Sequence, residues 1–224
     1  MAAAGKFPVI PDLKPVSPAE GPLFPARDIA LYASQLVNAG ACVLSVVTEP
    51  VQFGGSMEQL RHVAESACVP VLRKDFIRTR QDVDETANAG AAAILLICAC
   101  LSRSAISELY LYALEKGLEP LVEAHTEEEL LFASSLGAEL IGINNKDILQ
   151  LEKDGGTVAA TAALARNKPA GALLISESGI MDAADVRTAA ASGADAVLVG
   201  TSIWKADDPF AFYRKLCGAV HNYE

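Results

Sequence analysis

An alternation of short apolar runs with longer segments of helical spacing limits the fold of this chain more than any other feature. Runs rich in Val, Ile, Leu and Ala recur roughly every 25 to 30 residues, and the segments between them carry charged residues on their outer positions. This pattern is typical of repeated βα units. The eight predicted strands are 7–13, 42–47, 69–73, 92–97, 120–123, 140–143, 172–176 and 196–199. The eight predicted helices are 26–38, 57–66, 80–88, 103–116, 127–135, 156–167, 183–191 and 209–217.

One device repeats where four of the predicted helices end. A glycine followed by an alanine precedes the next strand at Gly40, Gly90, Gly137 and Gly193. We expect these glycines to adopt the left-handed conformation that terminates helices. The repeat is architectural and carries no chemistry.

The predicted strands are apolar nearly throughout, which favours a parallel sheet covered on both faces over an exposed antiparallel one. Eight βα units in 224 residues favour an α/β fold, the closed (β/α)8 or TIM barrel, with an open doubly wound sheet as the second candidate. Because 51% of the residues are apolar, we expect one domain over residues 1–224 with a substantial core. A barrel also predicts that ligands bind at the C-terminal ends of the strands.

Charge and composition exclude several classes of function. A formal net charge of −10 argues against a nucleic-acid surface, which needs clustered Lys and Arg. No stretch reaches the roughly 18 apolar residues of a membrane helix, and the first residues lack the apolar segment of a secretory signal. Five cysteines without a CxxC pair suit a reducing compartment, so we expect a cytoplasmic protein. Cys98 and Cys100 are predicted to share a strand face, but further ligands at zinc spacing are missing, so no metal site is expected.

Charged residues gather at the predicted strand ends, and Lys74 is the expected chemical centre. It follows the apolar run 70–72, so a rigid strand would hold its ammonium group at the barrel mouth. Asp12 and Lys14 are two residues apart and share a face, as do Glu123 and His125. The other polar strand ends carry Asn144, Asn145 and Lys146, then Glu177 and Ser178, and finally Gly200, Thr201 and Ser202.

These residue types suit acid–base chemistry on an anionic ligand. Lys74 is expected to donate a proton and Glu123 to accept one. His125 is interpreted as a hydrogen-bonded supporting side chain. The seventh and eighth strands end in Ser178-Gly179 and Gly200-Thr201, and loops at these positions in many barrels offer backbone N–H groups to a phosphate.

Six segments closely resemble the indole-3-glycerol-phosphate synthase family. They are LSVVTE (44–49), FGGS (53–56), PVLRKDFI (70–77), LVEAH (121–125), IGINN (141–145) and SESGI (176–180). The resemblance implies a cofactor-free barrel that closes the indole ring of 1-(2-carboxyphenylamino)-1-deoxyribulose 5-phosphate and releases carbon dioxide and water. It also implies a small anionic phosphate-bearing substrate, a monomer or homodimer, and other tryptophan-pathway enzymes as further candidate partners.

The same resemblance implies a role for each matching residue. Lys74 matches a general acid, Glu123 the base for dehydration, and Lys14 a phosphate contact or second acid. Which lysine serves which proton transfer is left open. The remaining residues expected at the catalytic centre are Asp12, Asn144, Glu177 and Ser178. Those expected to bind substrate or its phosphate are Ser17, Phe53, Phe76, Lys146, Gly179, Gly200 and Thr201.

Three departures from the family pattern concern the segment before the first strand, the first strand itself and a residue after the sixth strand. Most of the family's N-terminal extension, a helix that covers the barrel mouth, is expected to be missing, because only six residues precede Phe7. The first-strand carboxylate is Asp12 where the family has Glu, and Lys146 stands where arginine is common.

Two other hypotheses for the function are a sugar-phosphate isomerase or Schiff-base aldolase with a lysine nucleophile, and a non-catalytic barrel that binds an anion.

Overall fold

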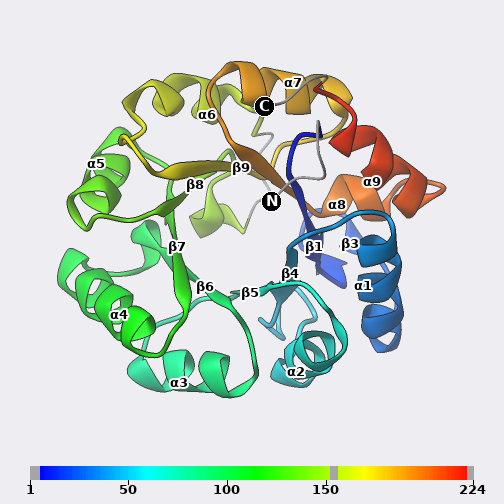
Figure 1. The fold of residues 1–224 in the computed structure, drawn as a ribbon, viewed down its shortest axis with the longest axis horizontal. Helices are drawn as coiled ribbons and strands as arrows, with labels where there is room; N and C mark the ends of the chain where they lie inside the picture. The colour runs from blue at the N-terminus through cyan, green and yellow to red at the C-terminus, as the bar shows by residue number, and fades with distance from the viewer. Residues whose placement is uncertain (1–5, 152–155, 221–224) are drawn as a thin grey trace.

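Eight parallel strands close into a barrel in the computed structural model, which describes residues 6–151 and 156–220 (Figure 1). The order around the barrel is β1, β10, β9, β8, β7, β6, β5 and β4, with β4 pairing back to β1. The strands are β1 (Val9–Leu13), β4 (Leu44–Val47), β5 (Val71–Lys74), β6 (Ala93–Ile97), β7 (Glu119–Ala124), β8 (Leu140–Asn144), β9 (Leu173–Glu177) and β10 (Ala196–Val199). The prediction of eight strands in a closed barrel is confirmed.

Helices form a ring around the barrel (Figure 1). They are α1 (Ile29–Asn38), α2 (Met57–Ser66), α3 (Arg80–Asn88), α4 (Arg103–Glu115), α5 (Glu127–Ser135), α6 (Ala159–Leu164), α7 (Ala183–Ala191), α8 (Thr201–Trp204) and α9 (Pro209–Cys217). Eight of them fall where the sequence predicts helices. Four ends differ: 26–28 and 165–167 are the 3-10 turns η1 (Ala26–Asp28) and η4 (Ala165–Asn167), 156–158 precede α6, and Lys116 follows α4.

Several short elements were not predicted. They are a two-stranded sheet of β2 (Val16–Ser17) and β3 (Gly21–Pro22), the 3-10 turns η2 (Cys98–Cys100) and η3 (Ile148–Gln150), and helix α8. The glycine device is confirmed, since Gly40, Gly90, Gly137 and Gly193 all have positive φ.

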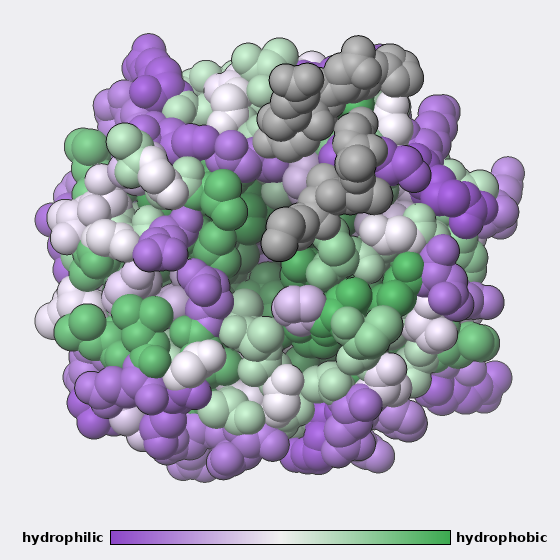
Figure 2. Space-filling model, viewed as in Figure 1, coloured by the Kyte–Doolittle hydropathy of each residue, from purple (hydrophilic) through white to green (hydrophobic). Residues whose placement is uncertain are grey.

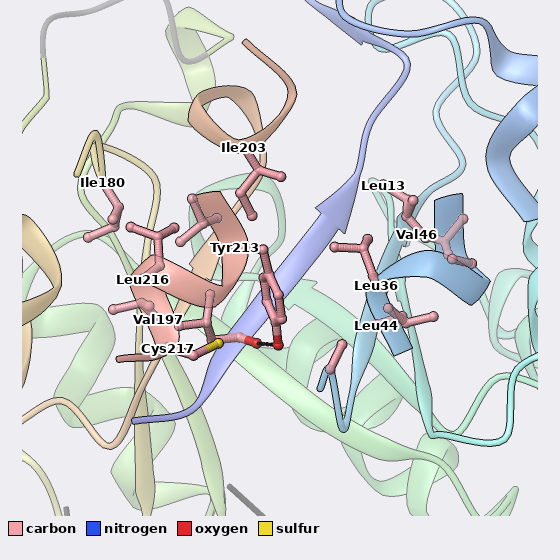
Figure 3. Close-up of a cluster of buried hydrophobic side chains, with 14 of the residues drawn as sticks. Leu13, Leu36, Leu44, Val46, Ile180, Val197, Ile203, Tyr213, Leu216 and Cys217 are labelled. Carbon is pink, nitrogen blue, oxygen red and sulfur yellow. Dashed lines mark hydrogen bonds between the residues drawn. The ribbon is translucent and has the colours of Figure 1, made fainter. Parts of the chain in front are cut away.

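The core has two layers because strand residues alternate between the inside of the barrel and the helices. On the outside, β1 packs between α9 on one side and α1 on the other, as Leu13, Leu36, Val197 and Leu216 show (Figure 3). The Tyr213 hydroxyl donates a hydrogen bond of 3.1 Å to the Val9 carbonyl in this cluster (Figure 3). Inside the barrel a smaller apolar cluster contains Leu72, Leu95, Leu121, Ile175 and Leu198.

The surface seen along the barrel is polar at its rim, and apolar side chains gather toward the centre (Figure 2). Within the part of the chain that the structure describes, no helix is both long enough and apolar enough to cross a membrane.

The prediction that Cys98 and Cys100 share a strand face is wrong. Strand β6 pairs with β7 only as far as Ile97, and the chain then turns into η2, which contains both cysteines. The pKa of Cys98 is raised to about 12, mainly by burial and to a smaller extent by nearby carboxylates, so this thiol stays protonated.

Candidate active site

Lys74 lies inside the barrel at the end of β5, between two buried carboxylates. Its Nζ atom is 3.7 Å from Glu123 Oε2 and 3.5 Å from Glu177 Oε2. The exposed fractions are 9% for Lys74, 2% for Glu123 and 0% for Glu177. Three residues from strands far apart in sequence therefore form one charge cluster, as the barrel geometry predicts.

Strand periodicity explains why Lys74 faces inward. Leu72 lies two residues earlier on the same face and belongs to the apolar cluster inside the barrel. Arg73, between them, faces the helix layer, where it donates hydrogen bonds to Thr86 and to the Asp82 carbonyl. A glycine makes room for the neighbouring carboxylate, because a Cβ at Gly142 would lie 2.0 Å from Glu177 Oε1.

Asn144 orients the second carboxylate of the cluster. Its Nδ2 donates a 3.2 Å hydrogen bond to Glu123 Oε1, and its Oδ1 accepts one from the Lys146 backbone N–H. The His125 Nδ1 atom lies 2.8 Å from the Asn144 carbonyl oxygen. This contact gives His125 the hydrogen bond expected of it, and its supporting role stays a prediction.

Asp12 is fixed at the end of β1 by neighbours on both sides. The Ser45 hydroxyl donates a 2.6 Å hydrogen bond to Asp12 Oδ1, and Trp204 Nε1 donates a 2.7 Å bond to the Asp12 carbonyl. Lys14 follows directly after the strand, and its Nζ lies 5.6 Å from the centre of the Phe53 ring. The close packing of these groups holds a carboxylate and an ammonium at the same side of the mouth.

The cavity at the mouth has an apolar lobe of about 330 Å³. Phe53 and Phe76 line it with their ring centres 6.5 Å apart. The other lining residues are Lys14, Val47, Glu49, Lys74, Asp75, Leu95, Ile97 and Ile148. A flat aromatic group fits such a lining, because aromatic side chains give it offset or edge contacts.

A second, polar lobe of about 620 Å³ shares Lys14 and Lys74 with the first. The segments after β9 and β10 line it with small residues, which are Ser178, Gly179, Gly200 and Thr201. The predicted residues Asp12, Ser17 and Lys146 line it as well. Basic side chains and small loop residues suit an anion, whose oxygens accept hydrogen bonds from backbone N–H groups.

All fourteen residues predicted to be catalytic or to bind substrate thus lie at this end of the barrel. Eleven line the two lobes, while Glu123, Glu177 and Asn144 form the charge cluster beneath them. Sequence reasoning missed the wall residues Leu95, Ile97 and Ile148, although the alternation along 93–97 would have placed the first two on the inner face.

Among residues 6–151 and 156–220, no group of three or more His, Cys, Asp or Glu side chains is arranged to hold a metal ion. The clustered groups that the structure describes at the mouth are instead ammonium groups, carboxylates and amides. They can donate and accept protons, and they can bind an anion.

The fold and this site define the class of protein: a (β/α)8 barrel with a buried lysine–carboxylate cluster at the mouth of the barrel. The model of the family described as indole-3-glycerol phosphate synthase matches residues 1–216. The chain belongs to the indole-3-glycerol phosphate synthase family, and so to the carboxy-lyases of tryptophan biosynthesis.

Individual relatives agree with this assignment. The chain is 43% identical to the indole-3-glycerol phosphate synthase of Thermococcus kodakarensis over 213 residues, which cover 95% of this chain and 93% of that protein. It is 40% identical to the enzyme of the same name from Pyrococcus furiosus, covering 96% and 94% of the two chains. It is also 39% identical to a multifunctional tryptophan biosynthesis protein of Phanerodontia chrysosporium, covering 96% of this chain and 28% of that protein.

Proposed function

We propose that the two-lobed cavity binds 1-(2-carboxyphenylamino)-1-deoxyribulose 5-phosphate and that the Lys74 cluster closes its indole ring. The observation that carries the proposal is the contrast between the lobes. An aromatic-lined lobe and a polar, glycine-containing lobe meet at two lysines. The substrate has the matching order of groups: a carboxyphenyl ring at one end, a phosphate at the other and the reacting ketone between them.

Lys74 is placed to act as the acid in ring closure. As the ring carbon that bears the carboxylate attacks the ketone carbon, the ketone oxygen takes a proton from the ammonium group and becomes a hydroxyl. The ring is then cationic, and the buried carboxylates Glu123 and Glu177 favour that charge. Loss of carbon dioxide returns an electron pair to the ring and removes the positive charge.

Dehydration needs one base and one acid. Glu123 removes a proton from the chain carbon next to nitrogen, and a lysine, Lys14 or Lys74, protonates the departing hydroxyl so that water leaves. Asn144 keeps Glu123 oriented through the bond to Oε1. Asp12 and Lys14 both line the polar lobe.

The phosphate is proposed to lie in the polar lobe. Backbone N–H groups at Gly179, Gly200 and Thr201, with the hydroxyls of Ser17 and Ser178, would hold its oxygens, and Lys146 would balance its charge. Local basic residues are needed because the whole chain has a net charge of −10 and would otherwise repel a dianion.

The direct test is whether indole fluorescence appears when the purified protein is mixed with this substrate. We expect Lys74→Met to lower kcat by about 100-fold to 10,000-fold, the range for loss of a general acid. Lys215→Met is the matched control, because Lys215 is an exposed residue of helix α9. The proposal is wrong if the parent gives no signal at high protein concentration, or if Lys74→Met is as active as the parent. Borohydride reduction separates the proposal from a Schiff-base aldolase, which alone would be trapped covalently.

The proposal extends to the setting of the enzyme. It takes residues 1–224 as one cytoplasmic domain that acts without a cofactor, as a monomer or homodimer. The fused fungal relative supports contact with other tryptophan-pathway enzymes. Light scattering of the purified protein would give the oligomeric state.

A further inference from the structure

A buried amide lies behind the polar lobe and bonds to the loop that forms one wall of that lobe. Asn145 is 4% exposed and immediately follows β8. Its Nδ2 lies 2.9 Å from the Ser176 hydroxyl, 2.9 Å from the Glu177 carbonyl and 3.0 Å from the Ser178 carbonyl. Its Oδ1 accepts hydrogen bonds of 3.0 and 2.9 Å from the backbone N–H and hydroxyl of Thr161 in α6.

The partners fix the orientation of this amide. A backbone N–H only donates, so the atom facing Thr161 must be the oxygen, and backbone carbonyls only accept, so the atom facing Glu177 and Ser178 must be the nitrogen. The amide uses both ends at once, and its own backbone N–H also donates 2.8 Å to the Glu177 carbonyl. Three segments are thereby joined: the end of β8, the start of the β9–α7 loop, and α6.

The loop held in this way has an unfavourable backbone conformation. Ser178 has a φ of +61°, in the left-handed region that is unfavourable for a residue with a Cβ. Gly179 follows with a φ of +69°, and a Cβ there would lie 2.8 Å from the Gly156 carbonyl oxygen and 3.3 Å from Asn145 Cβ. Both loop residues line the polar lobe. A strained conformation persists only where its surroundings hold it. The Asn145 side-chain amide donates hydrogen bonds to the carbonyl of Glu177, just before Ser178, and to the carbonyl of Ser178 itself.

We propose that Asn145 is a positioning residue that holds Ser178 and Gly179 in the anion-binding conformation. It acts through the loop backbone and makes no contact with the ligand itself. The inference rests on the proposed anion site in the polar lobe. It assigns to Asn145 a role separate from that of its neighbour Asn144, which faces the charge cluster.

The test uses Asn145→Asp, which keeps the shape of the side chain and replaces the donor by an oxygen that repels the two carbonyls. We expect KM for the phosphate-bearing substrate and the inhibition constant of inorganic phosphate to rise by about tenfold or more, the effect of losing buried hydrogen bonds. We expect kcat to change by less than about threefold, since Lys74 and Glu123 keep their contacts.

Tyr213→Phe is the matched control for stability alone. It removes one buried hydrogen bond, from the hydroxyl to the Val9 carbonyl, in the outer core packed around α9. It should lower the free energy of unfolding and leave KM and phosphate inhibition unchanged. If Asn145→Asp behaves in the same way, the positioning role is wrong.

A second variant covers the case in which Asn145→Asp does not fold. Thr161→Val removes one of the two donors to Asn145 Oδ1 and should raise the phosphate inhibition constant about threefold; no rise overturns the inference. A parent without turnover that still binds inorganic phosphate, more weakly in the variants, would refute the proposed reaction and support the positioning role. If the parent is active and the variants keep the parent's KM and phosphate inhibition constant, the positioning role is refuted and the proposed reaction is supported.

Discussion

Replacing Lys74 by methionine should destabilise the fold in a way that depends on pH. The substitution removes a cation that lies 3.5 and 3.7 Å from two buried carboxylates. At an effective dielectric constant near 20, each contact is worth about 4–5 kcal/mol before solvation is counted. The loss is limited, however, because the variant can take up a proton on one carboxylate.

The cost of that proton sets the expected magnitude. At pH 7, protonating a glutamate of ordinary pKa about 4.3 costs about 1.4 kcal/mol for each of roughly 2.7 pH units, or about 3.7 kcal/mol. At pH 5 the same step costs about 1 kcal/mol. In this range the folded variant binds more protons than its unfolded chain, so its stability relative to the parent falls as pH rises. We therefore expect a loss of about 3–4 kcal/mol at pH 7 and about 1 kcal/mol at pH 5.

Urea unfolding at both pH values measures this difference. The fluorescence of Trp204, the single tryptophan of the chain, reports the unfolding. Combining Lys74→Met with Glu177→Gln should recover most of the loss at pH 7, because one of the two carboxylates is then neutral without taking up a proton. A loss that is equal at the two pH values, or larger at pH 5, would refute the reasoning.

Three further predictions concern other parts of the molecule. Arg73→Leu should lower the free energy of unfolding by about 3–5 kcal/mol in urea, since it leaves the part-buried Asp75 without the guanidinium 2.9 Å away, and Arg73→Lys should cost less. Burial alone would raise the pKa of Asp82, but the backbone N–H groups and threonine hydroxyl at the start of α3 lower it overall. Its stabilising effect should be present above the unfolded pKa of about 3.9 and lost as pH falls through the lower folded pKa, so the parent should lose stability more steeply than Asp82→Asn between about pH 5 and 2. Exposed Cys68 should react with a thiol reagent at about pH 8, whereas Cys98, with a pKa of about 12, should react only after unfolding.

Much of the fold could be predicted because its signal is local and repeated. Each apolar run fixes a strand, each helix carries its own end signals, and eight repeats leave few ways to close the sheet. The convergence of Lys74, Glu123 and Glu177 follows from the same reasoning, since parallel strands bring their C-terminal ends to one mouth. The position of this charge cluster could therefore be predicted before any distance was known.

The rest depends on contacts that sequence does not encode locally. Strand β6 ends at Ile97 as predicted, but nothing in the local sequence shows that the chain then turns into η2, so that Cys98 and Cys100 do not share a strand face. The role of Asn145 depends on Thr161 and Ser178, which lie 16 and 33 residues further along the chain. Read from sequence alone, Asn145 is one more polar residue at a strand end.

The structure accounts for the large number of polar residues at the strand ends by dividing them into two sets. At three strand ends, neighbouring residues have opposite orientations: one contacts the charge cluster inside the barrel, and the other bonds to the helix layer outside. The inward and outward partners are Lys74 and Arg73, Asn144 and Asn145, and Glu177 and Ser176. Each outward residue hydrogen-bonds to a helix residue and so helps to fix the backbone that carries its inward neighbour. Chemistry and its support thus occupy adjacent positions. Substitution of an inward residue should lower kcat, whereas substitution of its outward neighbour should lower stability or ligand affinity and leave kcat nearly unchanged.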